Sequence, residues 1–96
     1  MAYKPNAIYH LFNQGNNQRP IFYQERNYIF FIKKIRKHLH PITDILAYCL
    51  MPNHFHLLME QIVENGISKF MARLSGGYSR YFNERYNRSG TLFQGP

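Results

Sequence analysis

The chain has 96 residues, and its net charge and aromatic content are both high. This length predicts one domain, residues 1–96, with no room for a second. Hydrophobic residues make up 45% of the chain, enough for a small core, so the composition excludes a disordered protein. Twelve basic and five acidic residues give a net charge of +7, which is typical of proteins that bind nucleic acid or an acidic surface.

The sequence also argues against a membrane protein. It has no run of about 18 apolar residues, and its N-terminus lacks the pattern of a signal peptide. One cysteine cannot form an internal disulfide, which fits a reducing, cytoplasmic location. Because Cys49 lies within an apolar run, we expect it to be a small buried residue.

The first half of the chain predicts a strand and then a helix. Residues 7–12 are rich in aromatic and β-branched side chains, which favours a strand, and the polar residues 13–20 predict a loop. In residues 24–39 the apolar side chains recur at the spacing of an amphipathic helix, and Pro41 ends the pattern. Lysines and arginines occupy the opposite face of this predicted helix.

The second half predicts a hairpin, a second helix and the start of another strand. Residues 42–50 and 53–60 form the hairpin, joined by a tight connection at Pro52. Residues 67–86 form the helix, which either kinks at Gly76-Gly77 or approaches a neighbour closely there. A last strand begins near Thr91. The order β-α-β-β-α-β predicts an α+β fold, the ferredoxin-like split arrangement with an antiparallel sheet, with the last strand incomplete.

The segment His54-Phe55-His56 carries the chemistry. On a strand, His54 and His56 point to the same face and Phe55 to the other, with roughly 6.5–7 Å between the two histidine Cα atoms. A helical pair would need i, i+4 spacing instead. The segment therefore predicts a two-histidine half-site for a divalent metal, and the alternative is the polar face of an ordinary half-exposed strand.

A metal held by two histidines needs a third protein ligand, with water or substrate oxygens completing the set. Imidazole suits Zn, Cu, Fe and Ni, whereas Mg and Mn prefer oxygen. The candidates are Glu60, Gln94 and His10, although Glu60 lies about 13 Å further along the same strand face. We expect His10 to be packed or hydrogen-bonded and not to be a ligand.

These residues resemble a known family, the single-tyrosine HUH transposases of the IS200-like group, and most closely the REP-associated tyrosine transposases. The HUH motif, histidine, bulky hydrophobe, histidine, is similar to His54-Phe55-His56. Residues 47–58 resemble the family's signature strand pair, and residues 15–22 resemble its loop after the first strand. Residues 78–83 and 88–95 resemble its second helix and the turn into the last strand, so the resemblance covers nearly the whole chain.

The resemblance implies a DNA transposase domain that binds single-stranded or hairpin DNA. The histidine pair would hold Mg²⁺ or Mn²⁺, which polarises the scissile phosphate, and a tyrosine would attack that phosphate. The resulting 5′-phosphotyrosine preserves the bond energy for rejoining. The alternative is a catalytically incomplete module that binds single-stranded nucleic acid.

In the IS200-like family that this sequence resembles, the nucleophilic tyrosine lies on a helix after the last strand. One helical turn beyond that tyrosine, an amide side chain can complete the metal site. That helix would lie beyond residue 96, so we expect a C-terminally truncated member and can assign the nucleophile to no residue here. Tyr78 and Tyr81 lie on the apolar stripe of the second predicted helix, which favours core packing for both. If one tyrosine of this chain acts, we expect Tyr81.

Cationic side chains are expected to contact DNA phosphates, which position a nucleic acid without specifying its sequence. For residues 33–37 the alternative is a solvated helix face. The unfinished last strand and the missing helix would leave a sheet edge and apolar surface uncovered, so we also expect a homodimer. The candidate DNA contacts are Arg19, Lys33, Lys34, Arg36, Lys37, Arg80 and Arg88.

Overall fold

The computed structural model describes residues 6–39 and 41–94. Its elements are β1 (Ile8–Gln14), the short 3₁₀ helix η1 (Asn16–Gln18), α1 (Glu25–Leu39), β2 (Thr43–Met51), β3 (His54–Gln61) and α2 (Gly66–Arg85). The α+β class is therefore confirmed, and the first five main elements follow the expected order. Of the expected last strand, residues 91–94 make one isolated bridge, between Phe93 and Gly15.

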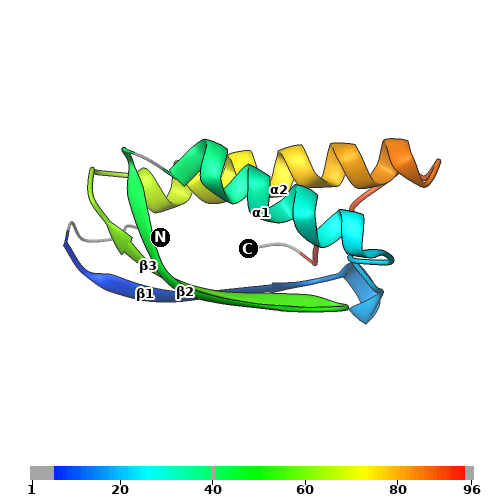
Figure 1. The fold of residues 1–96 in the computed structure, drawn as a ribbon, viewed down its shortest axis with the longest axis horizontal. Coiled ribbons are helices and arrows are strands. Elements are labelled where there is room, and N and C mark those ends of the chain that lie inside the picture. Colours follow the sequence, from blue (N-terminus) through cyan, green and yellow to red (C-terminus); the bar gives the residue numbers. More distant parts are fainter. Residues whose placement is uncertain (1–5, 40, 95–96) are drawn as a thin grey trace.

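The three strands form one antiparallel sheet in the order β1-β3-β2. Both helices lie on the same face of this sheet, as Figure 1 shows. No other described element covers the opposite face, which we call the open face. The central strand β3 is thus held on both edges by hydrogen bonds, whereas only one of its two faces is buried.

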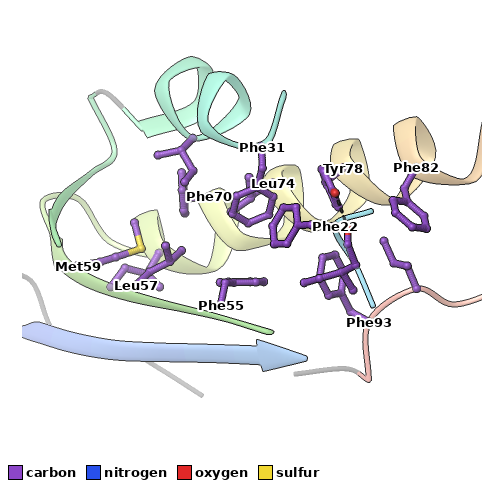
Figure 2. Close-up of a cluster of buried hydrophobic side chains, with 14 residues drawn as sticks. Phe22, Phe31, Phe55, Leu57, Met59, Phe70, Leu74, Tyr78, Phe82 and Phe93 are labelled. Carbon is purple, nitrogen blue, oxygen red and sulfur yellow. Dashed lines mark hydrogen bonds between the residues drawn. The ribbon is translucent and has the colours of Figure 1, made fainter. Parts of the chain in front are cut away.

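The core lies between the sheet and the two helices. From β3, the side chains of Phe55, Leu57 and Met59 point toward the helices and are fully buried (Figure 2). Burying each such side chain contributes roughly 1.5–3 kcal/mol, so this face of β3 is strongly fixed. The other large, fully buried side chains are Ile21, Phe31, Ile67, Phe70, Leu74, Tyr78, Phe82 and Leu92.

The helix α2 continues through its two glycines. Gly77 faces α1, where an added Cβ would lie 3.4 Å from Cε of Lys34, and Gly76 has no neighbour within 4 Å. Since 3.4 Å is an ordinary van der Waals contact with a flexible side chain, a close approach requires neither glycine, and α2 is one continuous helix here. No helix in the described ranges is both long and apolar enough to cross a membrane.

Two details differ from the sequence-based expectations. β1 extends to Gln14, into the predicted loop, because Gln14 still pairs with His54 of β3. The prediction that Cys49 is buried is wrong, because Cys49 is exposed. It lies opposite His56 on the open face of β2, where no described element covers it. An apolar run marks a strand without saying which of its faces is covered.

A buried asparagine joins the start of α1 to the end of α2. Oδ1 of Asn27 accepts hydrogen bonds from the backbone N–H groups of Tyr23, at 2.7 Å, and Gln24, at 2.9 Å. The hydroxyl of Tyr86 donates to the same oxygen at 3.1 Å, and Nδ2 of Asn27 donates to the hydroxyl of Tyr81 at 3.1 Å. One side chain at the third position of α1 therefore accepts from the backbone N–H groups of the two residues before the helix, as the third residue of a capping box does for the N-cap.

We expect Asn27→Ala to lower the free energy of unfolding by about 2 kcal/mol, because two backbone N–H groups would lose their acceptor, the fully buried Asn27 side chain. Urea denaturation followed by circular dichroism measures this change. Asn27→Asp keeps the accepting oxygen beside the positive end of the helix dipole, so it should cost less than the alanine variant. Equal stability of the wild type and Asn27→Ala would contradict this role.

Candidate metal centre and nucleic-acid surface

The open face of the sheet carries both histidines of the His-x-His segment. In β3 the burial alternates, with His54 and His56 half-buried and Phe55 buried on the helix side. The prediction that the two histidines share a face is therefore confirmed. Directly opposite residues of an antiparallel pair also share a face, so the register names the neighbours of the two histidines. They are Gln14 and Phe12 from β1, and Met51 and Cys49 from β2.

The two imidazole rings lie close together and are turned at right angles. Their centroids are 5.2 Å apart and the planes of the two rings meet at 89°. Both rings are only half-buried, so their edges can be reached from solvent. With the ring centroids this close, one nitrogen of each ring can approach a small cation between the two rings.

The turn before β3 orients the first histidine. Nδ1 of His54 lies 2.8 Å from Oδ1 of Asn53, which can only accept, so Nδ1 of His54 carries the proton. A neutral imidazole has one N–H, and Nε2 of His54 is then an unprotonated donor for a metal. Backbone hydrogen bonds hold this turn in place. The carbonyl of Asn53 accepts from the N–H of Gly15 at 3.0 Å, and the carbonyl of Pro52 accepts from the N–H of Ile21 at 2.8 Å.

A third histidine, from β1, orients the second one. Nε2 of His10 lies 2.9 Å from Nδ1 of His56, and the two rings are stacked with their centroids 5.0 Å apart. If Nδ1 of His56 donates to His10, Nε2 of His56 is free to bind a metal; the reverse tautomer would block it. The expectation that His10 is hydrogen-bonded is confirmed.

The choice of a third ligand among Glu60, Gln94 and His10 stays a prediction, and the structure places the three residues differently. Glu60 is four strand residues from His56, which is about 13 Å, and Nε2 of His10 already contacts His56. Oε1 of Gln94 accepts a hydrogen bond from Nε2 of Gln14. This bond uses Nε2 of Gln14 and not its amide oxygen. Gln14 occupies the strand position directly opposite His54, so that oxygen is available beside the histidine.

The donor set fits a partial metal site. Within the described residues, no group of three or more His, Cys, Asp or Glu side chains could hold a metal ion. Two imidazole nitrogens and an amide oxygen are available, and both imidazoles have second partners of the kind that orient metal ligands. Such a set leaves several coordination positions for water or for substrate oxygens.

No tyrosine of the described residues lies on the open face. Tyr78 is fully buried, its hydroxyl donates to the carbonyl of Ile21, and burial is the main cause that raises its pKa far above the usual range. Tyr81 stacks on Phe30 of α1 with the ring centroids 3.7 Å apart. Both therefore belong to the helix side of the sheet, as core packing predicts. The remaining described tyrosines on the helix side are Tyr9, Tyr23, Tyr28, Tyr48 and Tyr86.

The positive charge is on the helices. α1 contains five lysines and arginines and α2 contains four, together nine of the twelve in the chain, whereas the three strands contain none. Within the two helices the only acidic residues are Glu25 and Glu84. The candidate DNA contacts on helices are thus separated by the sheet from the histidine pair. They are Lys33, Lys34, Arg36 and Lys37 of α1, and Arg80 of α2.

Cations gather most closely where α1 meets α2. Burial lowers the pKa of His38, and the nearby charges of Lys34, Lys37 and Arg73 lower it further. Nζ of Lys34 also lies 5.4 Å from the centroid of the Phe30 ring. Like charges held together in this way favour an anionic partner.

The other two candidate DNA contacts lie outside α1 and α2. Arg19 follows η1 and donates from Nη2 to the hydroxyl of Tyr23 at 3.3 Å, and its Nε is buried without a partner. Arg88 follows α2, donates to the side chain of Asn83 and lies over the ring of Phe82. Both side chains are half-buried, so their contacts within the protein limit what they offer to DNA.

A cavity of about 680 Å³ borders the histidine pair at Phe12, whose ring centroid is 5.0 Å from that of His56. It is between one edge of β1, the helix α2 and residues 90–93, and neither His54 nor His56 lines it. The site is therefore an exposed patch on the open face and not a deep pocket.

Two neighbours of the histidines, Phe12 and Gln14, were not identified from the sequence. The alternation of side chains in β1 places both on one face, but it does not say which strand lies beside them. Their position beside His54 and His56 follows from pairing between segments some 40 residues apart.

A comparison with protein families gives one match. The model of a family described as IS200-like transposases matches residues 3–96, nearly the whole chain. A search of curated proteins finds no match.

We expect the hydrogen bond that Nδ1 of His56 donates to His10 to fix the tautomer of His56. His10→Leu removes the acceptor, so His56 should populate both tautomers and the affinity for Mn²⁺ should fall by about 10- to 100-fold. The ¹⁵N chemical shifts of the ring nitrogens in the metal-free protein report the tautomer, and calorimetry reports the affinity. His10→Gln retains an accepting oxygen and should preserve both properties. Unchanged ring shifts in His10→Leu would contradict this role.

Proposed function

Because the chain belongs to the IS200-like transposase family, we propose that it binds single-stranded or hairpin DNA and carries the divalent-metal site used to cleave and rejoin that DNA. The observation that supports this most strongly is the histidine pair. His54 and His56 share the open face, and Nδ1 of each has a hydrogen-bond partner. Nε2 of His54 is then available, and Nε2 of His56 is available when its Nδ1 donates to His10. The REP-associated subgroup stays a prediction.

In this proposal the chain's own residues hold and orient a phosphate. His54 and His56 would bind the divalent cation, Mg²⁺ or Mn²⁺, with Gln14 as the nearest further oxygen donor. When bound, the cation supplies Lewis-acid polarisation of a phosphoryl oxygen. Asn53 and His10 hold the two rings in place, so little reorganisation is needed when the phosphate arrives.

The helix cations would supply most of the charge for binding. A groove of lysines and arginines attracts phosphates at long range and makes binding depend strongly on salt. Since the sheet separates these cations from the histidines, one continuous DNA would have to contact both sides of the domain. A hairpin with a single-stranded extension offers two parts for two such surfaces. The expected homodimer stays a prediction, and both outer strands, β1 and β2, have an edge without a neighbouring strand in the described sheet.

A second candidate is a module that binds DNA without cutting it. It is favoured by the finding that no tyrosine of the described residues lies on the open face beside the histidines. The phosphotyrosine step needs a hydroxyl on the same side as the bound phosphate. Residues 1–96 of a single copy would then bind DNA and metal, and the nucleophile would have to come from outside the described residues of that copy.

We expect the histidine pair to account for metal binding. Replacing His54 and His56 together with alanine should abolish Mn²⁺ binding measured by calorimetry, while circular dichroism shows an unchanged fold. His38→Ala is the matched control, because His38 lies on α1 and should leave the affinity unchanged. Equal Mn²⁺ affinity in the double variant and the wild type would exclude this metal site.

Cleavage can be tested separately with a hairpin oligonucleotide that has single-stranded ends. We expect salt-sensitive binding and little or no covalent adduct on a denaturing gel when residues 1–96 are incubated with it and Mn²⁺. Tyr81→Phe should change neither result, since Tyr81 stacks on Phe30 on the helix side. A strong adduct that is lost in Tyr81→Phe would overturn this assignment and support Tyr81 as the nucleophile.

A further inference from the structure

Phe12 is an exposed aromatic residue at the centre of the histidine cluster. Half of its side chain is exposed, although a phenylalanine in a small domain usually contributes to the core. Its ring centroid is 5.0 Å from that of His56 and 5.7 Å from that of His54. It therefore borders both candidate metal ligands while leaving one side of its ring free.

The described strands place no cationic side chain on the open face around Phe12. None of the three strands contains a lysine or an arginine, and the acidic residues Asp44 and Glu60 face each other at the end of the sheet remote from His54. A DNA strand on this face would gain no ion pairs from side chains of the three strands, so its one ionic contact there would be with the cation held by the histidines. The carboxylates also repel it from the remote end.

Without ion pairs from these side chains, the affinity of this face for a nucleotide must come from other contacts. Stacking of a base on an aromatic ring is the main alternative, and it needs no charge and no particular sequence. The neighbours of Phe12 on the open face offer amide, imidazole and thioether groups. Among the described strands, the open face carries no second exposed phenylalanine or tyrosine. Phe12 is thus the residue on this face that fits a base.

We propose that Phe12 is a stacking platform for the nucleobase next to the phosphate held at the histidine pair. This inference rests on the proposed function and adds a subsite for a base to it. The histidines would act on the backbone of the strand and Phe12 on the adjoining base. Phe12 would then set the position of the strand along the sheet, and the helix cations would supply long-range attraction from the other side.

The absence of tryptophan in the chain allows a direct test. In Phe12→Trp the new indole is the only one, it remains aromatic, and a stacked base should quench its fluorescence. We expect quenching by a short oligothymidine in the presence of Mn²⁺. An oligomer of the same length built from abasic sites should give little quenching.

Tyr48 provides a matched control. It is 52% exposed against 50% for Phe12, but it lies on β2 with its side chain on the helix side of the sheet. Tyr48→Trp should therefore respond equally little to both oligomers. In affinity measurements, Phe12→Leu should weaken binding of oligothymidine by roughly 5- to 150-fold, and Tyr48→Leu should not.

The salt dependence separates stacking from charge. Phe12→Leu should lower the affinity without changing the slope of log K against log salt concentration, because no phosphate contact is lost. The loss should disappear when the abasic oligomer is the ligand.

Two outcomes would overturn this inference while leaving the proposed function intact. One is undiminished affinity of Phe12→Leu for oligothymidine, and the other is a change in oligomeric state, by sedimentation, that explains the loss. If the wild type bound neither oligothymidine nor hairpin DNA, both the inference and the proposed function would fall.

Discussion

The alternation of side chains along β3 is the constraint on which the rest of the structure depends. One face of this strand carries Phe55, Leu57 and Met59 into the core, and the other carries His54 and His56 toward solvent. A slip by one residue would bury the histidines and expose the apolar residues, at a cost of several kcal/mol. Burial of one face therefore fixes the chemistry of the other. Since β1 and β2 pair with both edges of β3, the position of the histidine pair is set by the whole sheet.

The orientation of the two histidine rings depends on neighbours of different origin. Asn53 is adjacent in sequence and belongs to the turn of the β2–β3 hairpin, whereas His10 comes from β1. The turn is itself held by backbone hydrogen bonds from Gly15 and from Ile21. Both ends of the segment between β1 and α1 thus support the turn. The candidate site is built from local and distant contacts together, which is usual where second partners orient metal ligands.

The separation of charge from the histidines divides the molecule into two surfaces. The helix layer, which lies on one side of the sheet (Figure 1), has nine of the twelve lysines and arginines, while the open face of the sheet has imidazole, amide and aromatic groups. Charge gives attraction at long range and little positional precision, whereas metal binding and stacking act only at contact. Binding and positioning of a nucleic acid would therefore be performed by opposite sides of this small domain. Net charge alone, taken from the composition, conceals this division.

The sequence by itself determined the properties that depend on neighbouring residues. Helical spacing gave α1 and α2 and placed Tyr78 and Tyr81 among packed side chains, and strand alternation put His54 and His56 on one face. Only the tertiary structure decided which strand lies beside another. It brought His10 and Phe12 to His56, left Cys49 exposed, and put the helix cations across the sheet from the histidines. The physical reason is that periodicity is a property of one segment, whereas pairing and coverage depend on the burial of apolar surface by the whole chain.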